Sequence, residues 1–82
     1  MKKIEIAIEM IEPWVDRHQP FAISLQAQLE WCQLRLSGLG QDAPKGELSL
    51  VSVAEKNFDE WNEKAHLVRL LHEIEEAARS FA

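Results

Sequence analysis

The sequence is poor in the residues that usually cross-link or interrupt a small protein. Its 82 residues include one cysteine, no tyrosine, three glycines and three prolines. One cysteine excludes an internal disulfide, and a zinc site of the usual Cys/His type needs more thiols. A single core in so short a chain contributes only about 3–5 kcal/mol of net stability. We therefore expect close helix packing or association with another chain to supply the rest.

Clusters of basic residues and long apolar segments are also missing. Nine Lys and Arg stand against 14 Asp and Glu, a net charge of −5, and no stretch concentrates positive charge. Nucleic acid is therefore an unfavoured partner. Acidic residues interrupt the first apolar run, so we predict neither a secretion signal nor a membrane span. A lone unpaired cysteine suits a reducing compartment, and we expect a cytoplasmic protein with no membrane partner.

No motif in the sequence demands a catalytic reaction. Gly-x-Ser-x-Gly and Cys-x-x-Cys are absent, and the pair Gly38 and Gly40 lacks the third glycine of a dinucleotide-binding loop. Cys32 lies in an apolar stripe, where a free cysteine behaves as a small hydrophobic residue. The sequence therefore predicts no enzyme, no catalytic residue and no cofactor.

Histidine spacing gives only a weak metal signal. Glu63 and His66 form a single Glu-x-x-His motif, whereas carboxylate-bridged di-metal bundles need two such motifs. Arg69 stands where the second glutamate would precede His72. We predict solvated surface pairs and no metal site, and we expect His18 to cap the end of the first helix.

Hydrophobic periodicity predicts an all-α fold, a small three-helix domain covering residues 1–82. The helices are expected at about 2–18, 20–37 and 53–80, the first kinked or broken at Pro13. Glycine and proline place a loop after the second helix, and the short connection predicts that helices two and three are antiparallel. Ser52 and Glu55 have the spacing of a capping box. Residues 47–51 stay open between a strand, a hydrophobic staple and a helical turn.

The second helix carries two apolar stripes on roughly opposite sides. A surface helix normally has one apolar stripe, so two stripes indicate that this helix is covered from both sides. One stripe is Phe21, Leu25, Leu29, Cys32 and Leu36, and the other is Ile23, Ala27, Trp31 and Leu34.

The apolar stripe of the third predicted helix rotates between its two halves. This drift predicts either a bend or break near His66, or two halves that cover different partners. Ala54, Phe58, Trp61, Ala65 and Val68 line the first half, and Leu67, Leu70, Leu71, Ile74, Ala78 and Phe81 line the second. We expect a homodimer, with interface candidates Ile23, Ala27, Trp31, Leu34, Leu67, Leu70 and Ile74.

Acidic residues supply the second candidate surface. The candidates on the first and third predicted helices are Glu5, Glu9, Glu12, Asp59, Glu60 and Glu63. They are consistent with an ordinary solvated face, and the alternative is a negative patch that meets a basic protein partner. The sequence thus favours a non-enzymatic protein–protein interaction module, acting as an inhibitor, an immunity or antitoxin-like protein, or an adaptor. The alternatives are an accessory subunit contacting nucleic acid or a nucleic-acid enzyme, and a small metal- or ligand-binding helical bundle.

Overall fold

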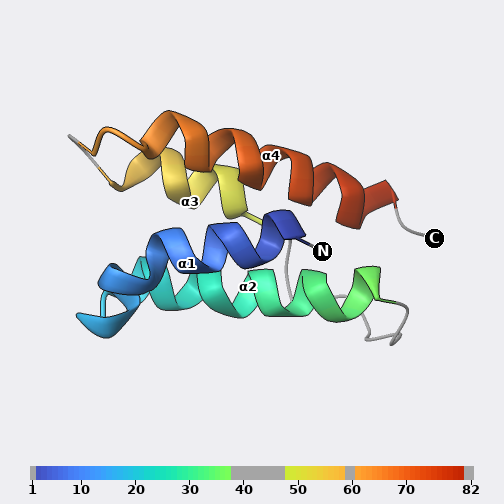
Figure 1. Ribbon diagram of the computed structural model, residues 1–82, viewed down its shortest axis with the longest axis horizontal. Coiled ribbons are helices and arrows are strands. Elements are labelled where there is room, and N and C mark those ends of the chain that lie inside the picture. Colours follow the sequence, from blue (N-terminus) through green and yellow to red (C-terminus); the bar gives the residue numbers. More distant parts are fainter. Residues whose placement is uncertain (1, 38–47, 59–60, 81–82) are drawn as a thin grey trace.

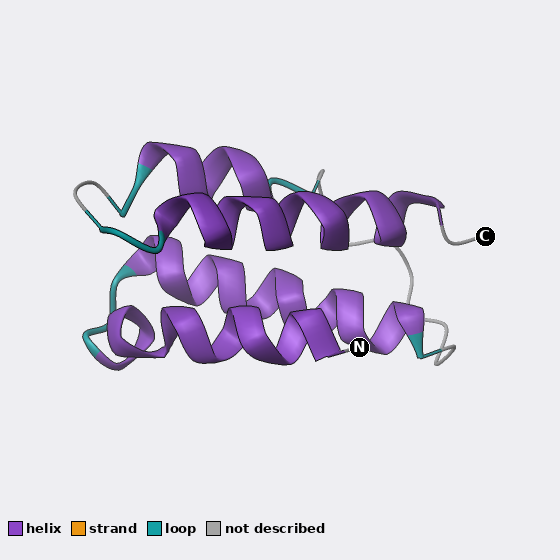
Figure 2. Ribbon diagram, turned by 45° about the horizontal axis from the view of Figure 1, so that its top comes forward, coloured by secondary structure: helices purple, strands orange, loops and turns teal. Residues whose placement is uncertain are grey.

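The computed structural model describes residues 2–37, 48–58 and 61–80 of the chain. These residues form a compact all-α domain of four helices with no strand, measuring 36 × 22 × 21 Å. The helices are α1 (Lys2–Asp16), α2 (Pro20–Leu36), α3 (Leu50–Lys56) and α4 (Lys64–Ser80). They form two antiparallel pairs, α1 with α2 and α3 with α4, packed face to face (Figures 1 and 2). The predicted all-α class is confirmed.

Helix α1 runs through Pro13 without a break, so of the two predicted alternatives, a kink or a break at Pro13, the break is wrong. Proline removes one backbone donor from the helix interior. Pro13 itself is exposed, while Ile11 before it is buried and Trp14 after it packs on the core. The packing on both sides of Pro13 therefore compensates for the missing backbone hydrogen bond.

A Schellman motif ends α1 and turns the chain into α2. The amide of His18 donates to the Val15 carbonyl (2.9 Å), and the amide of Gln19 donates to the Trp14 carbonyl (3.1 Å). His18 itself has φ 60°, which lies in the left-handed region that this motif requires. The predicted role of His18 at the helix end is therefore confirmed, and its backbone performs it. Pro20 then occupies the first turn of α2, as predicted.

The single helix predicted at 53–80 is wrong, because the chain turns back between α3 and α4. Helix α3 ends at Lys56 and α4 begins at Lys64. Between them Phe58 has φ 61°, a left-handed conformation that costs a bulky residue about 1–2 kcal/mol. The second helix is consequently antiparallel to α3 but runs in the same direction as α4 (Figure 1).

An aromatic cluster holds this corner against the turn between α1 and α2. We define the aromatic cluster as Trp14, Phe21, Phe58 and Trp61. The Phe58 ring meets the rings of Trp14 (4.8 Å between centroids) and Phe21 (5.0 Å) edge to face. The Trp14 and Trp61 centroids lie 4.5 Å apart. Such pairs contribute about 0.5–1.5 kcal/mol each beyond their buried area, which offsets the backbone cost at Phe58.

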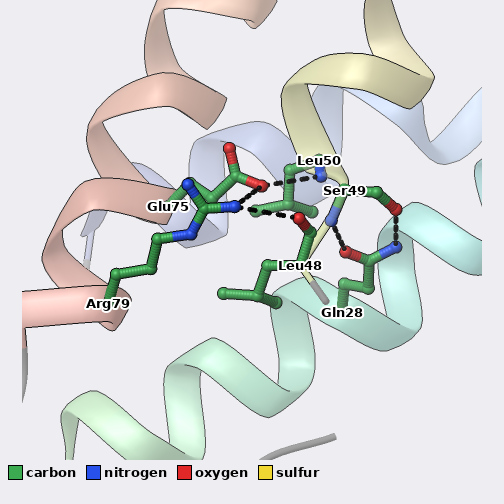
Figure 3. A network of polar contacts seen from close by, with 6 residues as sticks. All are labelled: Gln28, Leu48, Ser49, Leu50, Glu75 and Arg79. Carbon is green, nitrogen blue, oxygen red and sulfur yellow. Dashed lines mark hydrogen bonds and ion pairs between the residues drawn. The ribbon is translucent and has the colours of Figure 1, made fainter. Parts of the chain in front are cut away.

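Side chains from α2 and α4 cap the start of α3 (Figure 3). The Ser49 amide donates to Gln28 Oε1 (2.9 Å), and the buried Leu50 amide donates to Glu75 Oε1 (3.2 Å). Arg79 Nη2 donates to the Leu48 carbonyl (3.1 Å). The helix therefore begins at Leu50, and the predicted capping box is wrong because Ser52 lies inside α3.

One hydrophobic core joins the four helices. It uses the inward stripe of α2 and the second-half stripe of the predicted third helix, now α4. Its buried members are Ile4, Ala7, Ile11, Leu25, Leu29, Cys32, Leu50, Ala54, Phe58, Leu67, Leu71, Ile74 and Ala78. Of the second stripe of α2, Ile23, Ala27 and Leu34 are exposed, and Trp31 is half-buried against the edge of the core.

Candidate functional site

The outer face of α2 is the principal exposed apolar surface among the described residues. We define the outer face of α2 as Ile23, Ala27, Trp31 and Leu34. Ile23 is 44% exposed, Leu34 is 39% exposed, and Ala27 between them is also exposed. One other large apolar side chain in the described part of the chain, Ile6 on α1 at 36%, reaches comparable exposure. The four predicted α2 residues thus lie together on one helix face.

Trp31 forms the half-buried edge of this face. Its ring packs against the core, and the Arg35 guanidinium carbon lies 5.4 Å from the ring centroid. Arg35 Nε in turn donates to the Ala78 carbonyl of α4 (3.2 Å). Helix α4 therefore fixes Arg35, and Arg35 fixes the indole. A tryptophan positioned in this way loses little side-chain entropy when a partner covers it.

The three interface candidates on α4 lie inside the molecule. Leu67 and Ile74 are completely buried, and Leu70 is 8% exposed. They face inward because α4 turns back at the α3–α4 corner and covers the core with the stripe that a straight helix would have exposed. Leu67, Leu70 and Ile74 are therefore removed from the candidate interface.

The predicted acidic residues occupy separate elements. Glu5, Glu9 and Glu12 are all exposed and follow one side of α1. Glu63 is exposed just before α4, with an oxygen 3.6 Å from Nδ1 of His66. Asp59 and Glu60 lie outside the described residues. Of the four described acidic candidates, three therefore form a row on α1 and Glu63 lies on another segment, beside His66.

Lys3 connects the N-terminal turn of α1 to α4. Its ammonium lies 2.9 Å from a carboxylate oxygen of Glu73, and both side chains are close to half exposed. An exposed pair of this kind contributes at most about 1 kcal/mol. Lys3 thus links α1 to α4 and partly neutralises the Glu73 carboxylate.

The described titratable side chains do not form a candidate metal site. Within the described ranges, no group of three or more His, Cys, Asp and Glu side chains is placed to hold a metal ion. His72 Nδ1 lies 3.6 Å from Glu76, an exposed pair one helical turn apart. Burial raises the pKa of the Cys32 thiol to about 11, with a further contribution from the nearby Glu75 carboxylate. A buried thiol with this pKa is a poor nucleophile near neutral pH.

Two features of the fold escaped the sequence analysis. The aromatic cluster joins residues 14 and 21 to residues 58 and 61, and the cap of α3 joins residues 28 and 75 to residues 48–50. Both depend on contacts between segments distant in the sequence, which helical periodicity does not report. The sequence shows the residues concerned, namely three tryptophans, Gln28 on the flank of α2 and Glu75 within an apolar stripe. It does not show which residues they contact.

Comparisons with protein-family models, curated protein sequences and solved structures give no match to this chain. Among the described helices, none combines the length and the apolar character needed to cross a membrane.

Proposed function

We propose that this chain is a non-enzymatic protein–protein interaction module that pairs with a second copy through the outer face of α2. The observation that carries the proposal is the exposure of Ile23 and Leu34 on the same side of one helix. Exposed apolar side chains that gather on one face are typical of interaction surfaces. The inward stripe of α2 and the side chains of Leu67, Leu71 and Ile74 on α4 contribute instead to the core.

The spacing of side chains on α2 supports a two-fold antiparallel pair. In such a pair, residues equidistant from the helix centre meet across the axis. Centring the axis near Leu29 places Ile23 opposite Leu34 of the second copy. It also places the small Ala27 opposite the large Trp31. Large side chains thus meet spaces of complementary size, as close helix packing requires.

Charge opposes this pairing moderately, which gives it a recognisable salt dependence. Glu30 is exposed beside the outer face, and two-fold symmetry places both copies of Glu30 on the same flank. Each copy also carries a net charge of −5. Because salt screens like charges, added salt is expected to strengthen the dimer.

The test compares two aspartate substitutions at positions of matched exposure. Leu34→Asp places a charge inside the outer face of α2, whereas Ile6→Asp places the same charge on the exposed side of α1. We expect light scattering behind a sizing column to give a dimer for the unmodified chain and for Ile6→Asp, and a monomer for Leu34→Asp. A monomeric unmodified chain, or a Leu34→Asp dimer, would contradict the proposal.

The exposed acidic row of α1 supports a second candidate function, capture of a basic protein by an inhibitor, immunity or antitoxin-like protein, or adaptor. Glu5, Glu9 and Glu12 are all exposed, so their combined field reaches an approaching cationic surface. Binding of a lysine-rich peptide, followed by calorimetry, should weaken when salt is added. It should be lost when all three glutamates are replaced by glutamine. Because salt affects the two proposed interactions in opposite directions, one salt titration separates them.

A further inference from the structure

Arg35 reaches from α2 to the last turn of α4. Its Nε donates to the Ala78 carbonyl (3.2 Å), and α4 ends two residues later at Ser80. The last four carbonyls of a helix have no partner inside that helix, so this hydrogen bond satisfies one of them. The guanidinium charge also suits the partial negative charge at this end of a helix. The contact therefore stabilises both the end of α4 and the position of the Arg35 side chain.

The acceptor of this hydrogen bond is itself held in place. Ala78 is buried and belongs to the core. The next residue, Arg79, donates from Nη2 to the Leu48 carbonyl (3.1 Å) and lies 3.6 Å from Glu75 Oε1 (Figure 3). The last turn of α4 is thus bound to α2 and also to the segment that precedes α3. The Ala78 carbonyl consequently offers Arg35 an acceptor in a fixed place.

The same guanidinium lies over the indole of Trp31, one helical turn earlier on α2. Its central carbon is 5.4 Å from the ring centroid, within the distance of a cation–π contact. Both side chains are half-buried, which strengthens the contact relative to one in bulk water. A planar guanidinium can donate from its edge while its face covers a ring, whereas a lysine ammonium has no flat face. Arginine at position 35 therefore suits both contacts at once.

We propose that Arg35 is a positioning residue of the interface, which holds the Trp31 indole in the orientation that pairing through the outer face of α2 requires. This inference rests on the proposed pairing. In that pairing the indole packs over the small Ala27 of the second copy. A large side chain fits against a small one only in particular orientations, so the orientation of the indole determines how closely the two helices pack.

Fixing the indole before the copies meet raises the affinity of the pair. A partner that has to immobilise a free side chain binds more weakly, because the lost side-chain entropy opposes association. Two-fold symmetry places two Trp31 indoles in the interface, so the dimer meets this cost twice when Arg35 is lost. We expect the dimer to weaken about tenfold as a result.

The main experiment replaces Arg35 with lysine in the full chain. This substitution keeps the net charge at −5, so repulsion between the copies is unchanged. The dissociation constant of the dimer is measured by sedimentation over a dilution series, after circular dichroism has checked that each variant is folded. Arg35→Lys should raise it about tenfold. In a chain that also carries Trp31→Leu, the same substitution should change it less than about twofold, because no indole remains to be positioned.

A second comparison keeps the indole and controls for charge. Arg35→Gln and Arg69→Gln each remove one positive charge, and Arg69 is an exposed residue of α4. Arg35→Gln should raise the dissociation constant at least as much as Arg35→Lys, and Arg69→Gln less than about threefold. If Arg35 only stabilised the fold, its loss would lower the urea midpoint and leave the dissociation constant of the folded chain unchanged.

Equal dissociation constants for the unmodified chain and Arg35→Lys would overturn the positioning role. So would equal effects of Arg35→Lys with and without the Trp31 indole, or equal effects of Arg35→Gln and Arg69→Gln. In each of these cases the dimer still forms, so the proposed pairing survives. An unmodified chain that is monomeric at every concentration would instead contradict the pairing, and the positioning role with it.

Discussion

His18 adopts a backbone conformation that glycine would reach at lower cost. Its side chain is exposed, and its φ of 60° serves the turn between α1 and α2. Phe58 adopts the same backbone region, but there the aromatic cluster uses the side chain. Glycine can therefore replace His18 without loss of a packed side chain, whereas replacing Phe58 would remove a ring from the aromatic cluster.

Replacing His18 with glycine should stabilise the protein. Removing the left-handed penalty of about 1–2 kcal/mol outweighs the extra freedom of glycine in the unfolded chain, about 0.4–1 kcal/mol. We expect the urea midpoint to rise, with unfolding free energy higher by about 0.5–1 kcal/mol. The matched control is His72→Gly in the middle of α4, which should lower stability by about 1 kcal/mol. A loss of stability in His18→Gly would contradict the role assigned to this residue.

Cys32 links stability to alkaline pH. Its thiol pKa is raised from 9.0 to about 11 in the folded protein, chiefly because burial disfavours the thiolate. Stability from the neutral thiol is fully present below the unfolded pKa of about 9 and is lost as pH rises through about 11. We expect unfolding free energy to fall by roughly 2 kcal/mol across this window in the unmodified chain. In Cys32→Ala the fall should be smaller, and equal falls in both proteins would contradict the assignment.

At the scale of elements, the short helix α3 depends on contacts with the other helices for its stability. Seven residues are too few for a stable isolated helix. Its first amides are accepted by Gln28 and Glu75, and its buried Leu50 and Ala54 join the core. Helix α3 therefore exists only when α2 and α4 are in place, so its formation and the folding of the whole domain are one event.

Glu75→Ala should destabilise the protein by about 1–3 kcal/mol, because the buried Leu50 amide loses its acceptor. The next residue supplies the control. Glu76→Ala removes a side chain that is 74% exposed and should change stability by less than about 0.5 kcal/mol. Urea unfolding measures both variants, and hydrogen exchange at Leu50 should accelerate in the first variant alone. Similar losses in the two variants would show that the cap contributes nothing.

Sequence periodicity predicted the elements that carry a long apolar stripe. The all-α class, the extents of α1 and α2, and the exposed second stripe of α2 all follow from spacing, because a helix of 15 or 17 residues repeats its pattern several times. The stripe rotation in residues 53–80 also signalled a break. It placed that break near His66, whereas α4 already begins at Lys64.

The corner itself was beyond sequence analysis for a physical reason. Residues 57–63 contain no glycine and no proline, so no local preference reports a turn there. The turn exists because Trp14 and Phe21 pack on Phe58 from more than thirty residues away in the chain. For the same reason Leu67, Leu70 and Ile74 were predicted as interface residues, although the reversed α4 buries them.

At the scale of the whole molecule, one end of the bundle and its middle are held by different contacts. The turn between α1 and α2 and the corner between α3 and α4 lie at one end, joined by the aromatic cluster (Figure 1). The polar cap of α3 lies away from that end, along the middle of α2. The aromatic cluster and the polar cap of α3 are therefore two separate sets of contacts between segments that are distant in the sequence.

The contact between Trp14 and Trp61 is an intrinsic spectroscopic probe of the packing between the two turns. Two indoles with centroids 4.5 Å apart and planes inclined by 58° share their electronic excitation, which produces paired bands of opposite sign in far-ultraviolet circular dichroism. Those bands vanish when the two turns separate. The third tryptophan, Trp31, lies apart from this pair on α2, so its fluorescence responds to the covering of the outer face. The unlabelled chain thus carries one spectroscopic signal for the contact between its two turns and another for the proposed interface.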